Sequence, residues 1–242
     1  AYLSDRGESG RKDTFQIGQI YGAPRISVPS GGNPATVAPG DEFETINTTR
    51  GKLSRGATFS LLAMGGTGDD KFTVYSNKAE LRLEGNDGND EFVVRAFALA
   101  DASGKVSTEK RADLLGGLGD DIIRYNINAP VGLDGGTGFD RLVVSGTDFN
   151  DSFVITKDGV YGAGLNVRYD NVESVEVDGA EGDDHFFIQS SRAGVVNKMD
   201  GGNGNDTFDV SGDVTEPIVS KSLEGYSGVI NHQVTSTDVA YN

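Results

Sequence analysis

The chain has 242 residues, 35 of them glycine, and its hydrophobic share of 36% leaves little apolar material for a large compact core. Acidic residues outnumber basic ones by 37 to 21, and the net charge of −16 argues against nucleic acids and anionic membrane surfaces as partners and favours cations. Cysteine is absent, which excludes disulfides and thiol chemistry, and no stretch approaches the ~20 apolar residues of a transmembrane helix.

The first 60 residues carry little pattern. Residues 18–56 are rich in Gly, Pro, Ser and Thr, so we predict an irregular N-terminal coil, loop or cap over 1–60. One segment differs, because KDTFQI at 12–17 reads like the back half of the repeat described next. The chain begins Ala-Tyr-Leu and shows no signal peptide, so we expect it to be a segment of a longer protein.

One nine-residue pattern, G-x-x-G-x-D-x-U-x with U a bulky apolar residue, recurs from residue 65 onward. Its six copies are GGTGDDKFT at 65–73, GNDGNDEFV at 85–93, GGLGDDIIR at 116–124, GGTGFDRLV at 135–143, GAEGDDHFF at 179–187 and GGNGNDTFD at 201–209. Short alternating strands flank each copy, such as Leu81 and Leu83 before a turn and Phe92 and Val94 after one.

This grammar predicts an all-β fold over 61–213, a right-handed parallel β-roll or β-helix solenoid in which strands of successive coils pair in parallel. The first glycines of the copies are 20, 31, 19, 44 and 22 residues apart. We interpret 31 as one coil with an insertion at 100–110 and 44 as two coils. Within the long step, GTDFNDSFV at 146–154 reads as a degenerate turn on the opposite edge, and 153–162 as a hairpin-like excursion.

The final segment, 214–242, is again weakly patterned, and we predict a C-terminal coil or cap that leads toward a neighbouring domain. Apolar residues at the eighth motif position, such as Phe72, Phe92 and Phe186, are interpreted as a packed ladder along the coil.

The repeat itself points to a hard cation. Its glycines permit positive φ in a tight turn, and the sixth position always supplies a carboxylate. Calcium takes 6–8 oxygen ligands from carboxylates and carbonyls, whereas zinc and copper are disfavoured with no cysteine and two histidines. Aspartates stacked about 5 Å apart repel by roughly 1–3 kcal/mol per pair. Four gaps have suitable spacing, namely 70/90, 90/121, 121/140 and 184/206, and folding should therefore be coupled to calcium.

The six nonapeptides resemble the RTX (repeat-in-toxin, haemolysin-type) calcium-binding repeats, best in GGNGNDTFD and GGTGDDKFT. The resemblance implies a secreted, extracellular or cell-surface bacterial protein that folds on meeting calcium, and it implies calcium ligands from turn carbonyls and the sixth-position carboxylate. The implied ligand residues are Gly65, Gly66, Thr67, Gly68, Asp70, Gly85, Asp87, Gly88, Asp90, Gly116, Gly117, Gly119, Asp121, Gly135, Gly136, Gly138, Asp140, Gly179, Glu181, Gly182, Asp184, Gly201, Gly202, Gly204 and Asp206.

The sequence departs from tandem RTX repeats because the motifs mark mostly one edge. We therefore expect a single calcium ladder from Asp70 to Asp140 that lapses for one coil and resumes at Asp184 and Asp206. Phe139 at the fifth position is also atypical.

We therefore predict that the chain is a calcium-binding structural module, either a calcium-rigidified spacer or an adhesin segment. We expect it to be monomeric and not an enzyme. Two alternatives remain open. A polysaccharide lyase-like β-helix could use Arg124, Arg141 and Lys198, although nothing in the sequence places them together. A glycan- or protein-binding face could use tyrosines expected to be exposed, namely Tyr21, Tyr75, Tyr125, Tyr161 and Tyr169. His185 is interpreted as a solvated side chain beside the acidic ladder, and His232 belongs to no motif.

Overall fold

The computed structural model describes residues 2–4, 12–17, 29–30, 33–34, 45–48, 51–54, 61–74, 81–95, 112–126, 131–163, 165–216, 218–219 and 233–234. The predicted insertion at 100–110, most of 18–56 and most of 214–242 lie outside the described residues, as do Tyr21, Tyr75 and His232. No described helix is long and apolar enough to cross a membrane.

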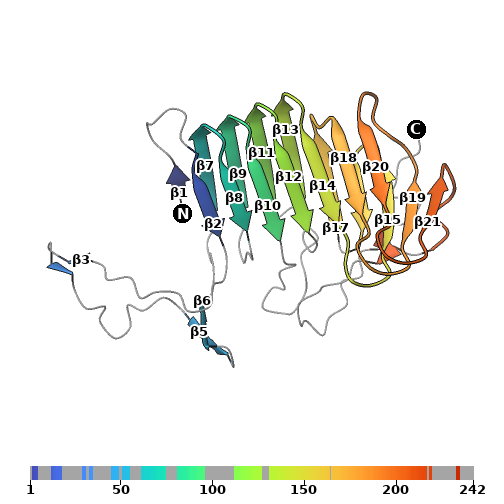
Figure 1. Cartoon of the computed structure of the whole chain (residues 1–242), viewed down its shortest axis with the longest axis horizontal. Helices are drawn as coiled ribbons and strands as arrows, with labels where there is room; N and C mark the ends of the chain where they lie inside the picture. The colour runs from blue at the N-terminus through green and yellow to red at the C-terminus, as the bar shows by residue number, and fades with distance from the viewer. Residues whose placement is uncertain are drawn as a thin grey trace.

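The described chain is all-β, and two large sheets run along the long axis of the molecule (Figure 1). The ten-stranded sheet, sheet A, has the order β1 (Tyr2–Ser4), β7 (Leu61–Thr67), β9 (Leu81–Asp87), β11 (Ala112–Leu118), β13 (Val131–Thr137), β17 (Leu165–Asp170), β16 (Gly159–Gly162), β15 (Ser152–Thr156), β19 (His185–Ile188), β21 (Thr207–Val210). The seven-stranded sheet, sheet B, has the order β2 (Thr14–Ile17), β8 (Lys71–Val74), β10 (Glu91–Arg95), β12 (Ile122–Asn126), β14 (Arg141–Ser145), β18 (Ser174–Asp178), β20 (Val196–Asp200).

Three small antiparallel pairs complete the described strands. These are β3 (Pro29–Ser30) with β4 (Asn33–Pro34), β5 (Thr45–Thr48) with β6 (Gly51–Ser54), and β22 (Ile218–Val219) with β23 (Gln233–Val234).

The core lies between the two sheets and is built by alternation along each strand. In β9 the buried residues Leu81 and Leu83 alternate with Arg82 and Glu84, which are accessible to solvent. Equivalent positions pair in register, so that like side chains stack from strand to strand. The expected strands flanking each turn are therefore confirmed.

Aromatic rings extend this stacking, as the sequence predicts. In sheet B, Phe72 stacks on Phe15 and on Phe92, with ring centroids 4.8 and 4.9 Å apart. The Phe15 contact confirms that 12–17 is the back half of a repeat, because β2 pairs in parallel with β8. A separate stack in sheet A joins Phe153, Phe186 and Phe208 at 5.1 and 4.9 Å. Phe208 belongs to the last strand of sheet A and remains 45% exposed.

Among the described strands of the two large sheets, the parallel order is broken where β15, β16 and β17 form antiparallel pairs in sheet A. This confirms the hairpin-like excursion predicted for 153–162. β16 separates the sheet A strands that lead to β13 from those that lead to β19, while sheet B runs through β14, β18 and β20 without interruption.

After β21 the chain folds back over the outer face of sheet A. Val214 and Ile218 pack against Val154 and Phe187, forming a small second apolar cluster. The hydroxyl of Ser152 donates to a Glu216 carboxylate oxygen at 2.6 Å. The described part of the C-terminal segment thus covers a sheet face.

Candidate metal centre

The glycine-aspartate turns fall into two rows at opposite ends of the strands. The first row contains 65–70, 85–90, 116–121 and 135–140, and each of these turns leads from sheet A to sheet B. The second row contains 146–151, 179–184 and 201–206, and each of these leads from sheet B back to sheet A. Strand β14 lies between the last turn of the first row and the first turn of the second row.

The expectation of a single ladder is therefore wrong. Asp184 and Asp206 do not continue the row of Asp140, because β18 pairs in parallel with β14 and the turns that follow these two strands are neighbours. The amide of Asp151 donates to Asp184 Oδ1 at 2.7 Å, which makes 146–151 the described start of the second row. The long step of 44 residues crosses from one edge to the other.

A chain of hydrogen bonds links the sixth-position aspartates within each row. The amide of Asp70 donates to Asp90 Oδ1, Asp90 to Asp121 Oδ1 and Asp121 to Asp140 Oδ1, at 2.7, 2.7 and 2.8 Å. In the second row the amide of Asp184 donates to Asp206 Oδ1 at 3.0 Å. The structure therefore brings together all four pairs that the spacing predicted. It adds Asp13, whose amide donates to Asp70 Oδ1 at 2.6 Å.

Sequence reasoning missed a second chain of hydrogen bonds, at the exposed fifth position of each turn. The amide of Asn89 donates to Asp69 Oδ1, and that of Asp120 to Asn89 Oδ1, at 2.9 and 2.8 Å. Charged and neutral side chains alternate at this position, as Asp69, Asn89, Asp120 in the first row and Asn150, Asp183, Asn205 in the second. The alternating D and N in the motif was the available signal.

Phe139 ends this outer chain in the first row. Its amide donates to Asp120 Oδ1 at 2.8 Å, but its side chain offers no acceptor to a following turn. The atypical fifth position thus marks the last motif of its row.

Glycine is required at the fourth position because a neighbouring carbonyl occupies the space that a side chain would need. A Cβ on Gly119 would lie 2.1 Å from the carbonyl oxygen of Gly88, and one on Gly138 would lie 2.1 Å from that of Gly119. Both residues have positive φ, at 119° and 135°. The fourth-position carbonyls therefore point across the gap toward the next turn. The turn 146–151, which begins the second row, has Phe149 instead of glycine at the fourth position.

First-position glycines leave room for a carboxylate oxygen. A Cβ on Gly116 would lie 2.1 Å from Asp121 Oδ2 and 2.2 Å from the carbonyl oxygen of Gly135. The same relation holds for Gly85, with Asp90 Oδ2 at 2.0 Å and the Gly116 carbonyl at 2.6 Å. Each gap therefore brings an aspartate Oδ2 close to the first carbonyl of the following turn, and two oxygen acceptors meet there.

Four of these aspartates bury an Oδ2 atom that has no hydrogen-bond donor within reach: Asp90, Asp121, Asp140 and Asp184. Each of the four residues is at most 1% exposed. Burial, followed by the neighbouring carboxylates, raises the pKa of Asp121 to about 7 and those of Asp90 and Asp184 to about 6. A buried anionic oxygen without a donor requires a proton or a cation.

The donor set fits calcium. Each gap is lined by two carboxylates and by carbonyls from the first and third positions of one turn and the second and fourth positions of the other, a hard, oxygen-only set. No group of three or more His, Cys, Asp or Glu side chains suited to a metal occurs among the described residues. A site here therefore depends on main-chain oxygens, and Asp87 and Glu181, whose side chains are exposed, can contribute only carbonyls.

The gap between Asp151 and Asp184 is different. Here the amide of Thr147 donates to Asp151 Oδ2 at 2.6 Å, so this oxygen already has a hydrogen-bond partner. The degenerate turn 146–151 thus satisfies within itself the carboxylate that the motif turns leave unsatisfied.

Three side chains correct other expectations. His185 is only partly solvated, with 23% of its side chain exposed, because its ring packs on Phe187 with centroids 3.9 Å apart and its two nitrogens lie 2.9 Å from Asp209 Oδ2 and 3.4 Å from Glu216 Oε1. Tyr125 and Tyr169, expected to be exposed, are 0% and 1% exposed and belong to the core. They cannot contribute to an adhesive face.

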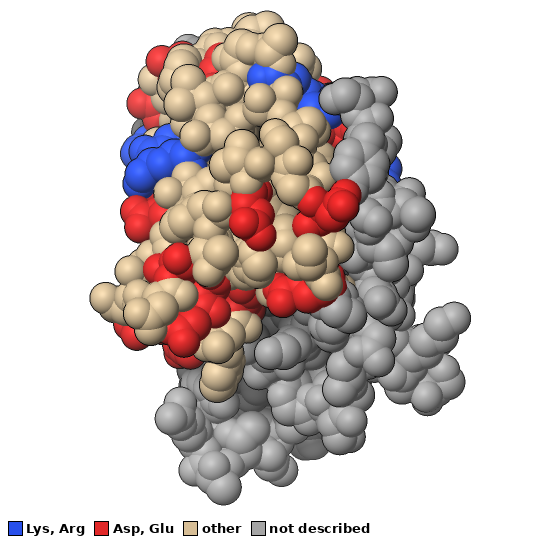
Figure 2. Space-filling view, turned by 90° about the vertical axis from the view of Figure 1, so that its right-hand side faces the viewer, with Lys and Arg blue, Asp and Glu red and all other residues tan. Residues whose placement is uncertain are grey.

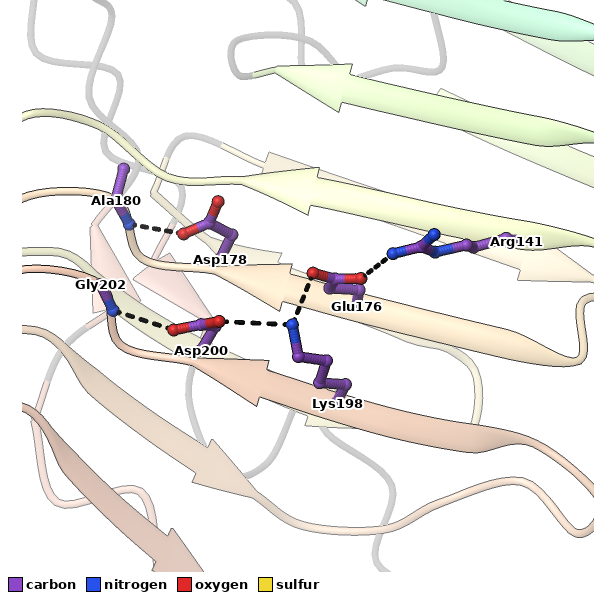
Figure 3. Close-up of polar contacts among 7 residues, drawn as sticks. All are labelled: Arg141, Glu176, Asp178, Ala180, Lys198, Asp200 and Gly202. Atoms are coloured by element: carbon purple, nitrogen blue, oxygen red, sulfur yellow. Dashed lines mark hydrogen bonds and ion pairs between the residues drawn. The ribbon is translucent and has the colours of Figure 1, made fainter.

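Charged residues on the outer face of sheet B form a network across three strands (Figure 3). Glu176 on β18 pairs with Arg141 on β14 and, at 2.9 Å, with Lys198 on β20. Lys198 also reaches Asp200 Oδ2 at 3.3 Å. The structure thus brings Arg141 and Lys198 together, while Arg124 pairs with Glu91 at 3.5 Å. Because acidic residues neutralise all three, these basic side chains are poorly suited to hold a uronate.

Acidic side chains spread over the end of the molecule near β20 and β21, and basic ones are confined to a few places there (Figure 2). A surface of one predominant sign concentrates ions of the opposite sign.

Comparisons with protein-family models, with curated proteins and with solved structures gave no match for this chain.

Proposed function

We propose that this chain is a calcium-binding structural module, with ions in the gaps between neighbouring motif turns. The observation that carries the proposal is the repeated buried Oδ2 atom, which faces a carbonyl oxygen of the next turn with no donor between them. These two oxygens repel each other, and a divalent cation bound between them would replace that repulsion with attraction. The proposed sites are the gaps 90/121, 121/140 and 184/206, where this atom occurs, and the gap 70/90, which is included because its two turns carry the same motif.

The contrast between the two positions of the turn supports this assignment. Aspartate alternates with asparagine at the fifth position, which keeps carboxylates apart where only solvent surrounds them. At the sixth position every motif turn carries an aspartate, although burial makes the repulsion between neighbouring carboxylates larger there. Uniform charge is tolerable at that position if cations lie between the carboxylates.

The fold and setting belong to the same proposal. Strands that alternate between two parallel sheets, joined by stacked turns, are consistent with a right-handed β-roll or β-helix solenoid. Together with the resemblance of the motif to RTX repeats, this supports a secreted bacterial surface protein in which the module serves as a calcium-rigidified spacer or adhesin segment.

Calcium titration of the chelator-treated chain tests the proposal. We expect the β circular-dichroism signal and the melting temperature to rise with calcium but not with equal magnesium, because magnesium gives up its water reluctantly and demands shorter, strictly octahedral bonds than a cage of main-chain oxygens supplies. Asp121→Asn, which borders two gaps, should raise the calcium concentration required at least tenfold. Asp158→Asn removes an exposed charge in the hairpin between β15 and β16, outside the motif turns, and serves as the control. Unchanged signal and melting temperature after complete calcium removal would rule out the coupling of folding to calcium.

A further inference from the structure

The first row continues beyond its last motif. After Asp140 the chain passes through β14, β15 and β16 before it runs along β17. It then makes the short turn 171–173, which carries no nonapeptide pattern. Strand β17 pairs in parallel with β13, and β18 pairs in parallel with β14. The turn between β17 and β18 therefore lies next to the motif turn 135–140, where the sequence had predicted a lapse.

Glu173 occupies the place of the next sixth-position aspartate. The amide of Asp140 donates to Glu173 Oε2 at 2.8 Å, the same distance as from the Asp121 amide to Asp140 Oδ1. The hydrogen-bond chain of the first row therefore passes from four aspartates to a glutamate without interruption.

Asn171 occupies the place of a first-position glycine carbonyl. A Cβ on Gly135 would lie 2.1 Å from the Asn171 carbonyl oxygen, close to the 2.2 Å found between Gly116 and the Gly135 carbonyl. Asn171 has a φ of 49°, in the left-handed region, and its side-chain amide donates to Asp134 Oδ1 at 2.7 Å. These two features hold its carbonyl oxygen toward the gap.

Asp140 supplies the independent indication of a ligand. It is fully buried, and its Oδ2 has no hydrogen-bond donor. This oxygen lies 2.6 Å from the same Cβ position on Gly135 that is 2.1 Å from the Asn171 carbonyl oxygen. A buried carboxylate oxygen and a carbonyl oxygen thus share one small space with no hydrogen-bond donor from the described residues between them.

We propose that a further calcium ion binds between turns 135–140 and 171–173, held by the carboxylates of Asp140 and Glu173 and the carbonyl of Asn171. The carbonyls of Gly136 and Gly138 complete the set, because the equivalent carbonyls of Gly117 and Gly119 point toward the following turn. This inference rests on the proposed function, since it extends the same row of sites by one.

Counting bound calcium by native mass spectrometry at saturating calcium tests the inference. Glu173→Gln keeps an oxygen acceptor for the Asp140 amide and removes only the charge, so we expect the variant to bind one ion fewer than the unaltered chain. Asp170→Asn removes an exposed carboxylate from the adjacent position, where it pairs with Arg192, and should leave the count unchanged. Asp121→Asn should lower the count through the motif sites.

The outcomes separate the two proposals. An unaltered chain that binds no calcium contradicts the proposed function. A chain that binds calcium, loses it in Asp121→Asn and keeps the full count in Glu173→Gln overturns the further site alone, as does an equal loss in Asp170→Asn. If Glu173→Gln is unstable in circular dichroism, anomalous scattering from crystals of the unaltered chain decides, because a peak must lie between Asp140 and Glu173.

Discussion

At the scale of single residues, each turn depends on glycines for two different reasons. The first-position glycine leaves room for an aspartate Oδ2, and the fourth-position glycine leaves room for a carbonyl oxygen of the neighbouring turn. Both roles concern contacts between turns that are far apart in sequence. The glycines of the motif are therefore required by the stacking of neighbouring turns as well as by the conformation of each turn.

Alanine substitution separates crowding from backbone conformation. Gly119 and Gly194 both have positive φ, but a Cβ on Gly119 meets the Gly88 carbonyl at 2.1 Å whereas one on Gly194 meets nothing within 4 Å. We expect Gly194→Ala to lower the free energy of unfolding by about 1–2 kcal/mol through backbone strain, and Gly119→Ala to lower it by at least twice that. Urea denaturation in saturating calcium measures both. Equal losses would show that crowding between turns is unimportant.

The raised pKa values predict an unusual pH dependence for the calcium-free chain. Folding moves the carboxyl pKa of Asp90 from 3.8 to about 6 and that of Asp121 to about 7, so the folded state favours the protonated forms. This contribution to stability is fully present below pH 3.8 and is lost as the pH rises through 6 to 7.

In chelator, we therefore expect the melting temperature to rise as the pH is lowered from about 7.5 to about 4.5. In calcium the trend should reverse, because protons compete with the ion for the same carboxylates. Circular-dichroism melts with and without chelator test both directions. A melting temperature that falls on acidification in chelator contradicts the assignment of buried, donor-free carboxyls.

At the scale of the elements, the stacking of turns sets charge patterns that a single turn does not reveal. Residues at the fifth position bond to their counterparts one turn away, and there the charge alternates between aspartate and asparagine. Neighbouring strands lie about 4.8 Å apart, so uniform aspartate would place like charges within that distance. The alternation belongs to the row and not to the individual motif.

Asn89→Asp tests whether the alternation matters. The substitution places a third carboxylate between those of Asp69 and Asp120 at the surface of the first row. We expect a loss of about 1–2 kcal/mol of unfolding free energy at low salt, from about 1 kcal/mol per new pair. The loss should largely disappear at about 1 M salt. In an Asp69→Asn, Asp120→Asn background the same change should have no effect, and a persistent loss there would exclude repulsion as the cause.

At the scale of the whole molecule, the sequence predicted the all-β parallel architecture and each adjacent aspartate pair, because spacings of 19 to 31 residues leave one way to stack them. It also predicted the opposite edge for the degenerate turn at 146–154, but it did not predict that the motif turns 179–184 and 201–206 lie on that same edge. A step of 44 residues equals two regular repeats, and counting residues does not distinguish this from a hairpin that adds β16 and shifts the turns. The available signal was GTDFNDSFV, which aligns with GAEGDDHFF 33 residues later and so begins the second row.

The two rows should therefore act independently. Asp140 and Gly146 are separated by the five residues of β14, a length of about 17 Å that exceeds the Debye length at physiological salt. We expect the effects of Asp121→Asn and Asp184→Asn on unfolding free energy in calcium to add within about 0.5 kcal/mol, because the two residues share no gap. Asp90→Asn and Asp121→Asn share one, so their combined effect should be smaller than the sum, since either change already disables that gap. Substantial coupling across the edges would contradict the two-row arrangement, and additivity within the first row would contradict shared sites.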